Sequence, residues 1–277
     1  MAKKKKVVIV GGGISAMLTA AVCNEQGFTP TVMVLRRSDP VGAFWLRDIP
    51  LIFHRKKFDS SKIFVHTIGT SENYMKKQWG DDYKNHESSF PVRGYPTVGY
   101  DPRILSLNHA KKILKFHHKP IECSLTDQDL LLLARPNTIV FYTFPSDKSF
   151  FKYSIDVPLL SKLKIASIPS DDYDYRVTYD GTPDSILSRH SNLFGTMSFE
   201  LRKFPEVTTH NGEVKIYGEW MRYREIYEIS PEAGNLDPLP PGERVIPVGR
   251  LACWRRKMLA SEVMHSVKKE LERFGYA

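Results

Sequence analysis

The sequence is poor in cysteine and lacks the spacings that mark disulfide frameworks or metal sites. Its three cysteines lie far apart, at Cys23, Cys123 and Cys253, and none belongs to a C-x-x-C pair. A disulfide framework and a cysteine zinc site are therefore not expected. The nine histidines show neither an H-x-x-x-H nor an H-E-x-x-H spacing. We accordingly expect no metal ligands in this chain.

Long apolar runs are also missing. No stretch reaches about 18 apolar residues, the length that crosses a bilayer, so no membrane span is expected. The basic residues 1–6 are followed by a short apolar stretch, as in a signal peptide. That stretch runs directly into Gly11-Gly12-Gly13, and no small-residue cleavage pattern follows it. We therefore interpret it as a first strand and expect a cytoplasmic protein.

Acidic residues are outnumbered, with 31 Asp and Glu against 40 Lys and Arg, a formal net charge of +9 and a pI of about 9.3. Such a surplus attracts anionic partners, among them nucleic acid, nucleotide-linked sugars and phosphates. For any single basic pair, such as Lys111-Lys112 or Lys268-Lys269, a solvated surface is the simpler interpretation. The charge keeps a nucleic-acid partner open without choosing among anionic ligands.

The first 36 residues have the pattern of a βαβ unit. Residues 7–10 (VVIV) form a β-branched apolar run typical of a buried parallel strand. A glycine turn follows, and then apolar residues recur at helical spacing up to Gly27, a plausible helix-ending glycine. Residues 31–35 are a second apolar strand. Strand, glycine turn, helix and strand thus occur in order within one short segment.

The glycine turn fits the dinucleotide-binding pattern G-x-G-x-x-[GA] at Gly11, Gly13 and Ala16. Gly11 permits the tight turn, Gly13 lets the backbone approach a pyrophosphate, and Ala16 allows close helix–strand packing. Ile14 and Ser15 would lie in the first helical turn, whose free N–H groups and positive dipole favour the pyrophosphate. The context of strand before and helix after makes these five residues candidate cofactor-binding residues.

The end of the second strand departs from the usual pattern. A carboxylate normally stands there and binds the adenosine ribose, whereas this sequence has Arg36-Arg37. Residues 32–43 nevertheless resemble the flavoprotein pattern in which an acidic residue precedes a later glycine pair, represented here by Gly42 with Ala43. An arginine at this position can also accept a 2′-phosphate. Arg36, Arg37 and Gly42 are therefore candidate cofactor contacts for FAD or, alternatively, NADP.

A second strand–glycine–helix segment closes the chain. Residues 245–267 (VIPVGRLACWRRKMLASEVMHSV) contain Gly249, Arg250, Ala252, Trp254 and Met258. They resemble the closing FAD motif of the UDP-galactopyranose mutase and protoporphyrinogen-oxidase-like (amine-oxidase-like) flavoproteins, G-R-x-[GA]-x-[WY] followed by a Met. In that superfamily the arginine contacts an FAD phosphate and the helix start lies near the flavin. The resemblance implies these places for Arg250 and Met258.

Two further segments resemble parts of the same family. Residues 49–57 (IPLIFHRKK) resemble the turn beside the isoalloxazine ring, which makes His54 a candidate catalytic residue. Residues 182–195 resemble a segment in which an arginine reaches the substrate pocket, and Arg189 is the matching residue. A packing role for His54 and an ordinary salt bridge for Arg189 are equally open alternatives.

The order of the elements predicts an α/β fold: a Rossmann-like FAD/NAD(P)-binding domain with an inserted antiparallel β-rich substrate domain. We expect residues 1–45 and 235–277, with parts of 105–170, to form the cofactor domain. Residues 46–104 and 171–234 would then form the substrate domain, because residues 173–179 and 213–229 alternate as antiparallel strands do. The last strand, at residues 245–248, would return to the sheet begun by the N-terminus.

The function that these patterns predict is that of an FAD-dependent oxidoreductase, with amine-oxidase-like dehydrogenation of an anionic or nucleotide-linked substrate. Three alternatives stay open: a flavoenzyme that modifies a base on DNA, a UDP-sugar mutase-like isomerase, and an NADP-dependent reductase or catalytically silent nucleotide-binding protein. The sequence identifies no general base and predicts no oligomeric state.

Overall fold

The structure is a computed structural model, and it describes residues 5–34, 60–123, 125–144, 160–172, 174–229, 242–253 and 260–276. The chain divides into two compact units. Unit 1 comprises Met1–Phe58, Pro102–Leu159 and Glu232–Ala277, and unit 2 comprises Asp59–Asp101 and Leu160–Pro231. Each unit contains one sheet.

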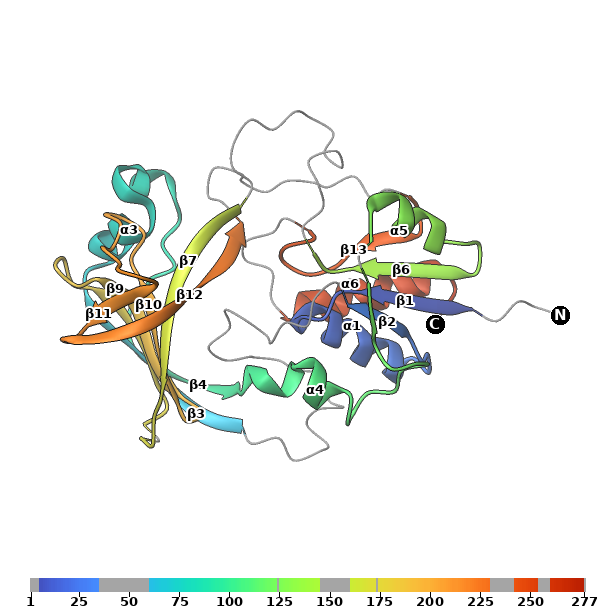
Figure 1. Ribbon diagram of the computed structural model, residues 1–277, viewed down its shortest axis with the longest axis horizontal. Helices are drawn as coiled ribbons and strands as arrows, with labels where there is room; N and C mark the ends of the chain where they lie inside the picture. Colours follow the sequence, from blue (N-terminus) through green and yellow to red (C-terminus); the bar gives the residue numbers. More distant parts are fainter. Residues whose placement is uncertain are drawn as a thin grey trace. The chain divides into compact units, whose positions relative to one another are not determined.

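Unit 1 is built on a five-stranded sheet in the order β13-β6-β1-β2-β5, in which every neighbouring pair is parallel (Figure 1). Its strands are β1 (Lys6–Val10), β2 (Thr31–Val34), β5 (Ile121–Glu122), β6 (Thr138–Tyr142) and β13 (Val245–Pro247). The C-terminal strand therefore does return to the sheet that the N-terminus begins, as the sequence predicts. β1 lies at the centre because its four apolar residues are buried on both faces.

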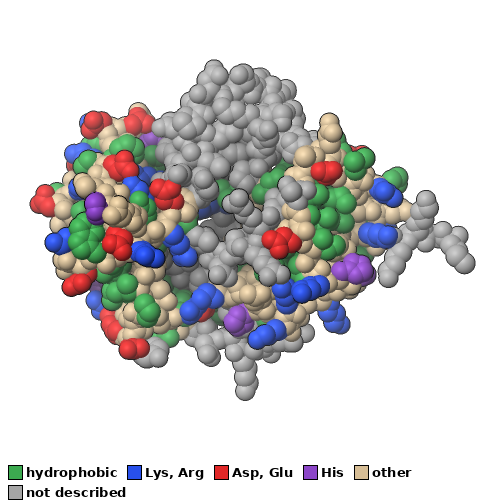
Figure 2. Space-filling view, viewed as in Figure 1, with side chains coloured by type: hydrophobic (Ala, Val, Ile, Leu, Met, Phe, Trp, Pro, Cys, Tyr) green, Lys and Arg blue, Asp and Glu red, His purple; other side chains and the backbone are tan. Residues whose placement is uncertain are grey.

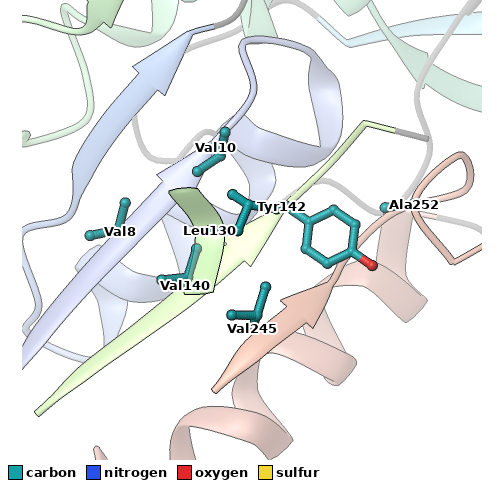
Figure 3. Close-up of a cluster of buried hydrophobic side chains, with 7 residues drawn as sticks. All are labelled: Val8, Val10, Leu130, Val140, Tyr142, Val245 and Ala252. Atoms are coloured by element: carbon teal, nitrogen blue, oxygen red, sulfur yellow. The ribbon is translucent and has the colours of Figure 1, made fainter. Parts of the chain in front are cut away.

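Helices cover both faces of this sheet. Val8 and Val10 of β1 point to the face covered by α5 (Asp127–Leu133), where Leu130 packs against them and against β6 and β13 (Figure 3). α1 (Ile14–Glu25) and α6 (Ala260–Arg273) pack against each other and lie on the opposite side of the sheet in Figure 1. Two short helical segments, η2 (Pro102–Leu105) and α4 (Leu107–Ala110), precede β5. Unit 1 is thus a three-layer α/β sandwich.

Local sequence signals account for the helix ends. Thr126 caps α5 in a reciprocal capping box with Asp129. α1 ends at Glu25, and Gly27 follows with a φ of +80°, the left-handed conformation that glycine adopts most easily. Among the described residues, no helix is both long enough and apolar enough to cross a membrane.

Unit 2 is an eight-stranded sheet in the order β11-β12-β7-β10-β9-β8-β3-β4. Its strands are β3 (Ser60–Gly69), β4 (Tyr95–Tyr100), β7 (Leu160–Pro169), β8 (Arg176–Gly181), β9 (Leu187–Leu193), β10 (Thr196–Leu201), β11 (Glu213–Ile216) and β12 (Glu219–Ile229). All neighbours are antiparallel except β3 and β8, which are parallel. The expected antiparallel β-rich insert is present, with this one parallel pair.

The connection between β3 and β4 carries α3 (Ser71–Trp79) and the 3-10 helix η1 (Gly80–Asn85). Thr70 caps α3 by accepting a hydrogen bond from the Asn73 backbone N–H at 3.2 Å. The helix packs on β8 and β9, and its buried residues are Tyr74, Met75 and Lys77. A separate apolar cluster joins Phe199 and Leu201 of β10 to Val214 and Ile216 of β11 in the same sheet.

Candidate cofactor site

The glycine turn of unit 1 lies at the carboxyl end of the central strand β1. Gly11 has a φ of +131°, and a Cβ at this position would collide with Thr143 Oγ1. Thr143 follows β6, and its backbone N–H donates to the Val10 carbonyl at 3.0 Å. The turn therefore fits between two neighbouring strands only because residue 11 has no side chain.

Gly13 is under no such steric constraint from the protein itself. Its φ of −86° is open to any residue, and a Cβ built there would meet no atom within 4 Å. The space above this α-carbon is thus open, and Gly12 to Ser15 are only half-buried. Backbone at this position can be approached closely by a ligand, as a pyrophosphate requires.

The first turn of α1 leaves its N–H groups for a ligand. The N-cap, Gly13, supplies no side-chain hydrogen bond, and the first turn carries no acidic residue. The backbone N–H groups of Ile14 and Ser15 belong to the first turn of a helix, which has no intrahelical acceptors for them. An uncapped helix N-terminus with positive dipole favours a bound anion. The residues present therefore fit the pyrophosphate of a dinucleotide.

The C-terminal glycine motif meets the N-terminal one. Gly249 is buried with a φ of +90°, and a Cβ there would collide with Ser15 Oγ and Cβ. The preceding residue, Val248, donates its N–H to the Tyr142 carbonyl at 2.9 Å, which continues the alignment of β13 beside β6. Arg250, next in the chain, is exposed. Segments more than 230 residues apart in sequence are thereby brought into direct contact at the start of α1.

This edge of the sheet is the place where parallel α/β folds bind their ligands. The chain runs from β1 to β2 on one side, whereas β6 lies on the other side of β1. Connections that leave in opposite directions open a crevice beyond the carboxyl ends of the strands, at the topological switch point. Gly11, Thr143 and Gly249 lie at these strand ends, so the site is built by three segments of unit 1. Thr143 was not anticipated, and its place directly after the apolar strand at residues 138–142 is the signal that would have indicated it.

The remaining predicted cofactor residues, Arg36, Arg37, Gly42 and Met258, and the predicted catalytic His54 lie outside the described residues. Their roles stay predictions. Among the described residues, no group of three or more His, Cys, Asp or Glu side chains is arranged to hold a metal ion.

Arg189 lies in β9 of unit 2, where it forms an ion pair with Glu200 of the neighbouring β10. Arg189 Nε donates to Glu200 Oε2 at 3.0 Å, and Ser188 Oγ donates to Glu200 Oε1 at 3.0 Å. Burial lowers the pKa of the Arg189 guanidinium, but Glu200, Tyr179 and Tyr74 together outweigh burial and raise it. The arginine is therefore a permanent cation beside a buried carboxylate. Its reach toward a substrate stays a prediction.

Comparisons with known proteins agree with this architecture. No protein-family model matches the chain, and no curated protein matches it either. Solved structures, in contrast, do match the chain. The chain is similar to an L-proline dehydrogenase from P. horikoshii, with a TM-score of 0.58, 11% identity and coverage of 99% of this chain and 95% of that one.

Two further structures match over nearly the whole chain. A flavin-dependent brominase has a TM-score of 0.52 at 10% identity, covering 98% of this chain and 79% of that one. A geranylgeranyl bacteriochlorophyll reductase-like protein from Thermoplasma acidophilum has a TM-score of 0.50 at 12% identity, covering 99% of this chain and 80% of that one. At such identities the likeness concerns the fold. The chain has the Rossmann-like FAD/NAD(P)-binding fold of the flavoenzymes, with an inserted β-rich unit, and the predicted fold class is confirmed.

Proposed function

We propose that the protein is an FAD-dependent oxidoreductase. The observation that carries this proposal is the convergence of the uncapped start of α1, the open space at Gly13 and the Gly249 turn at one edge of a parallel sheet. The fold shared with a flavin-dependent brominase supports a flavin as the cofactor. A bound flavin would supply the hydride-accepting ring, while the backbone of Gly13 to Ser15 would hold its pyrophosphate.

For the reaction, we propose amine-oxidase-like dehydrogenation of an anionic or nucleotide-linked substrate. The support is the resemblance of residues 245–267 to the amine-oxidase-like closing motif, in which Arg250 matches the phosphate-contacting arginine. The fold neighbour named an L-proline dehydrogenase is consistent with an amine-bearing substrate. UDP-sugar isomerisation and an NADP-dependent reaction are the alternatives that the experiment below separates.

The first experiment is the visible spectrum of the freshly purified protein, with identification of any cofactor released by heat. We expect a yellow protein that releases FAD, and a rise in its unfolding temperature when FAD is added back to the apoprotein. Stabilisation by NADP without any response to FAD would favour the reductase alternative. A colourless protein that responds to neither nucleotide would contradict the proposal. With FAD bound, turnover of amines and of UDP-sugars distinguishes dehydrogenation from isomerisation.

The variant Gly13→Ala tests the site itself. The new methyl group meets no protein atom within 4 Å, so the fold should be retained. The same methyl group would occupy the space that a pyrophosphate needs, and we expect FAD affinity to fall roughly tenfold or more, about 1.4 kcal/mol of binding free energy. Flavin fluorescence titration of the apoprotein measures this.

Gly212→Ala is the matched control. Its methyl group also enters open space, but it lies on the turn before β11 in unit 2. Its φ of +79° makes the change cost some stability. FAD affinity should stay at the wild-type value. Equal loss of FAD binding in both variants would show that the Gly13 effect is not local.

A further inference from the structure

The positive charge of the chain is concentrated in one of its two units. Unit 1 contains 26 Lys and Arg against 14 Asp and Glu, a net +12, whereas unit 2 contains 14 against 17, a net −3. The overall surplus of +9 therefore belongs entirely to the α/β unit. One stretch of this unit, residues 102–121, contains no acidic residue at all.

Within that stretch, residues 111–119 (KKILKFHHK) form what we call the basic segment. Among its apolar residues, Leu114 is only 5% exposed, and Ile113 and Phe116 are half-buried. Its polar residues point outward, and the exposed ones are Lys112, Lys115, His117, His118 and Lys119. Within the described part of the chain, none of these three lysines is paired with a carboxylate. Figure 2 shows blue and purple side chains gathered along this side of unit 1, over α4 and the segment that follows it.

The backbone of the basic segment is held in place at the C-terminal end of α1. Asn24 accepts from the Lys115 N–H at 2.7 Å and donates to the Lys115 carbonyl at 3.1 Å. The His117 N–H donates to the Pro30 carbonyl at 3.1 Å. A single cation would satisfy the negative end of the α1 dipole, so this helix end does not account for three lysines and two histidines.

The basic segment is separate from the cofactor site. α1 has 12 residues, so its two ends lie about 18 Å apart at 1.5 Å per residue. The glycine turn is at the first end and the basic segment at the second. Its charges are therefore not needed for the cofactor's pyrophosphate.

We propose that the basic segment binds the phosphate backbone of a nucleic acid. Regularly exposed lysines on an ordered backbone match a linear array of phosphates. An anionic membrane fits less well, because interfacial binding also needs exposed apolar side chains. Among the described side chains of residues 103–119, none is an exposed large hydrophobic one. The inference stands apart from the oxidoreductase proposal, because it concerns the other end of α1.

The test is fluorescence anisotropy with a labelled DNA duplex of arbitrary sequence, and with the matching single strand, across about 50 to 200 mM salt. The purified holoprotein is expected to bind at the low-salt end, with a logarithmic salt slope near −3, as about three phosphate contacts require. The double variant Lys112→Glu/Lys115→Glu should weaken binding by roughly tenfold or more and reduce the slope by about two.

The control is Lys84→Glu/Lys215→Glu, which changes the net charge equally but replaces exposed lysines of unit 2. It should bind within about twofold of the wild type. The milder Lys112→Gln/Lys115→Gln keeps the test decisive if charge reversal prevents folding, and melting curves verify the fold of each variant. FAD content should be unchanged in all of them, so failure of this inference and of the cofactor proposal are distinguishable.

Three results would overturn the inference. The first is no binding to either probe at low salt. The second is an equal loss of affinity in the unit 1 and unit 2 variants, since only net charge would then matter. The third is capture by vesicles containing phosphatidylserine without any duplex or single-strand binding, which would assign the basic segment to a membrane surface.

Discussion

At the scale of the single residue, unit 2 contains a lysine, Lys77, that is buried and bonded to three protein oxygens. Lys77 Nζ donates to the carbonyls of Asp180 and Leu187 at 2.9 and 2.7 Å, and to the Asp180 carboxylate at 3.2 Å. The two side chains are 3% and 5% exposed. Burial lowers the pKa of Lys77, although Asp180 partly opposes this. All three protons of the ammonium group thus have an acceptor, as a buried cation requires.

Removing this cation should destabilise unit 2 strongly. We expect Lys77→Met to lower the free energy of unfolding by about 3 to 5 kcal/mol, because Asp180 is left as a buried charge without its partner. Urea denaturation followed by circular dichroism measures this. The neighbouring Lys76, which is 48% exposed in its pair with Glu72, provides the control. If Lys76→Met is as damaging as Lys77→Met, burial is not the cause.

The same pair predicts an acid dependence of stability. Burial raises the pKa of Asp180, but hydrogen bonds from Ser185 and Thr182, together with Lys77, outweigh it and lower the pKa below the usual 3.8. A carboxylate with a depressed folded-state pKa stabilises the fold above its unfolded-state value. This contribution is lost as the pH falls below 3.8 and through the folded value. Asp180→Asn should therefore flatten the stability profile in that window, and an unchanged slope would contradict the assignment.

At the scale of the element, α5 shows how a short helix is stabilised by local capping and by packing against distant strands together. Seven residues are too few for a helix to persist alone. Thr126 Oγ1 accepts from the Asp129 N–H at 3.3 Å, and Asp129 Oδ2 accepts from the Thr126 N–H at 2.7 Å. Leu130, one turn in, is fully buried against β1 and β6 (Figure 3). Local capping and tertiary packing thus act on adjacent turns.

Thr126→Ala should therefore cost about 1 kcal/mol of unfolding free energy, the usual worth of an N-cap side chain. Thr126→Ser keeps the hydroxyl and should stay close to the wild type. Chemical denaturation of the two variants in parallel separates the lost hydrogen bond from any general effect of substitution at this position. A large loss in the serine variant would mean that the methyl group, rather than the cap, carries the effect.

At the scale of the whole molecule, each unit has its own sheet and core. A ligand or substitution in one unit should therefore change amide hydrogen exchange mainly in that unit. We expect FAD to slow amide hydrogen exchange in the first turn of α1 and around Gly249, because the ligand would hold these groups. Lys77→Met should instead speed exchange in β8 and β9, whose carbonyls the lysine ties together. Mass-spectrometric exchange on the same samples measures both, and protection of unit 2 strands alone by FAD would contradict the assignment of the site.

Features of the protein that depend on neighbours in the chain could be predicted from the residues alone. The βαβ start and the Gly27 helix end were both predicted, because turn geometry and helix termination involve residues within a few positions of one another. The return of residues 245–248 to the first sheet also followed from pattern, since a second strand–glycine–helix segment has few other places in such a fold.

Contacts between residues far apart in the chain became known from the folded arrangement. It brought Gly249 against Ser15 and Thr143 against Gly11, and it made β3 and β8 parallel neighbours. It also paired Lys77 with Asp180, and it placed Arg189 opposite Glu200 through the register of β9 and β10. Register and packing across a hundred residues leave no periodic trace in the sequence, because each partner's local pattern is satisfied by many alternative alignments. The order of the strands thus brings the residues of the cofactor site together, whereas the glycine motifs of that site can be recognised in the sequence.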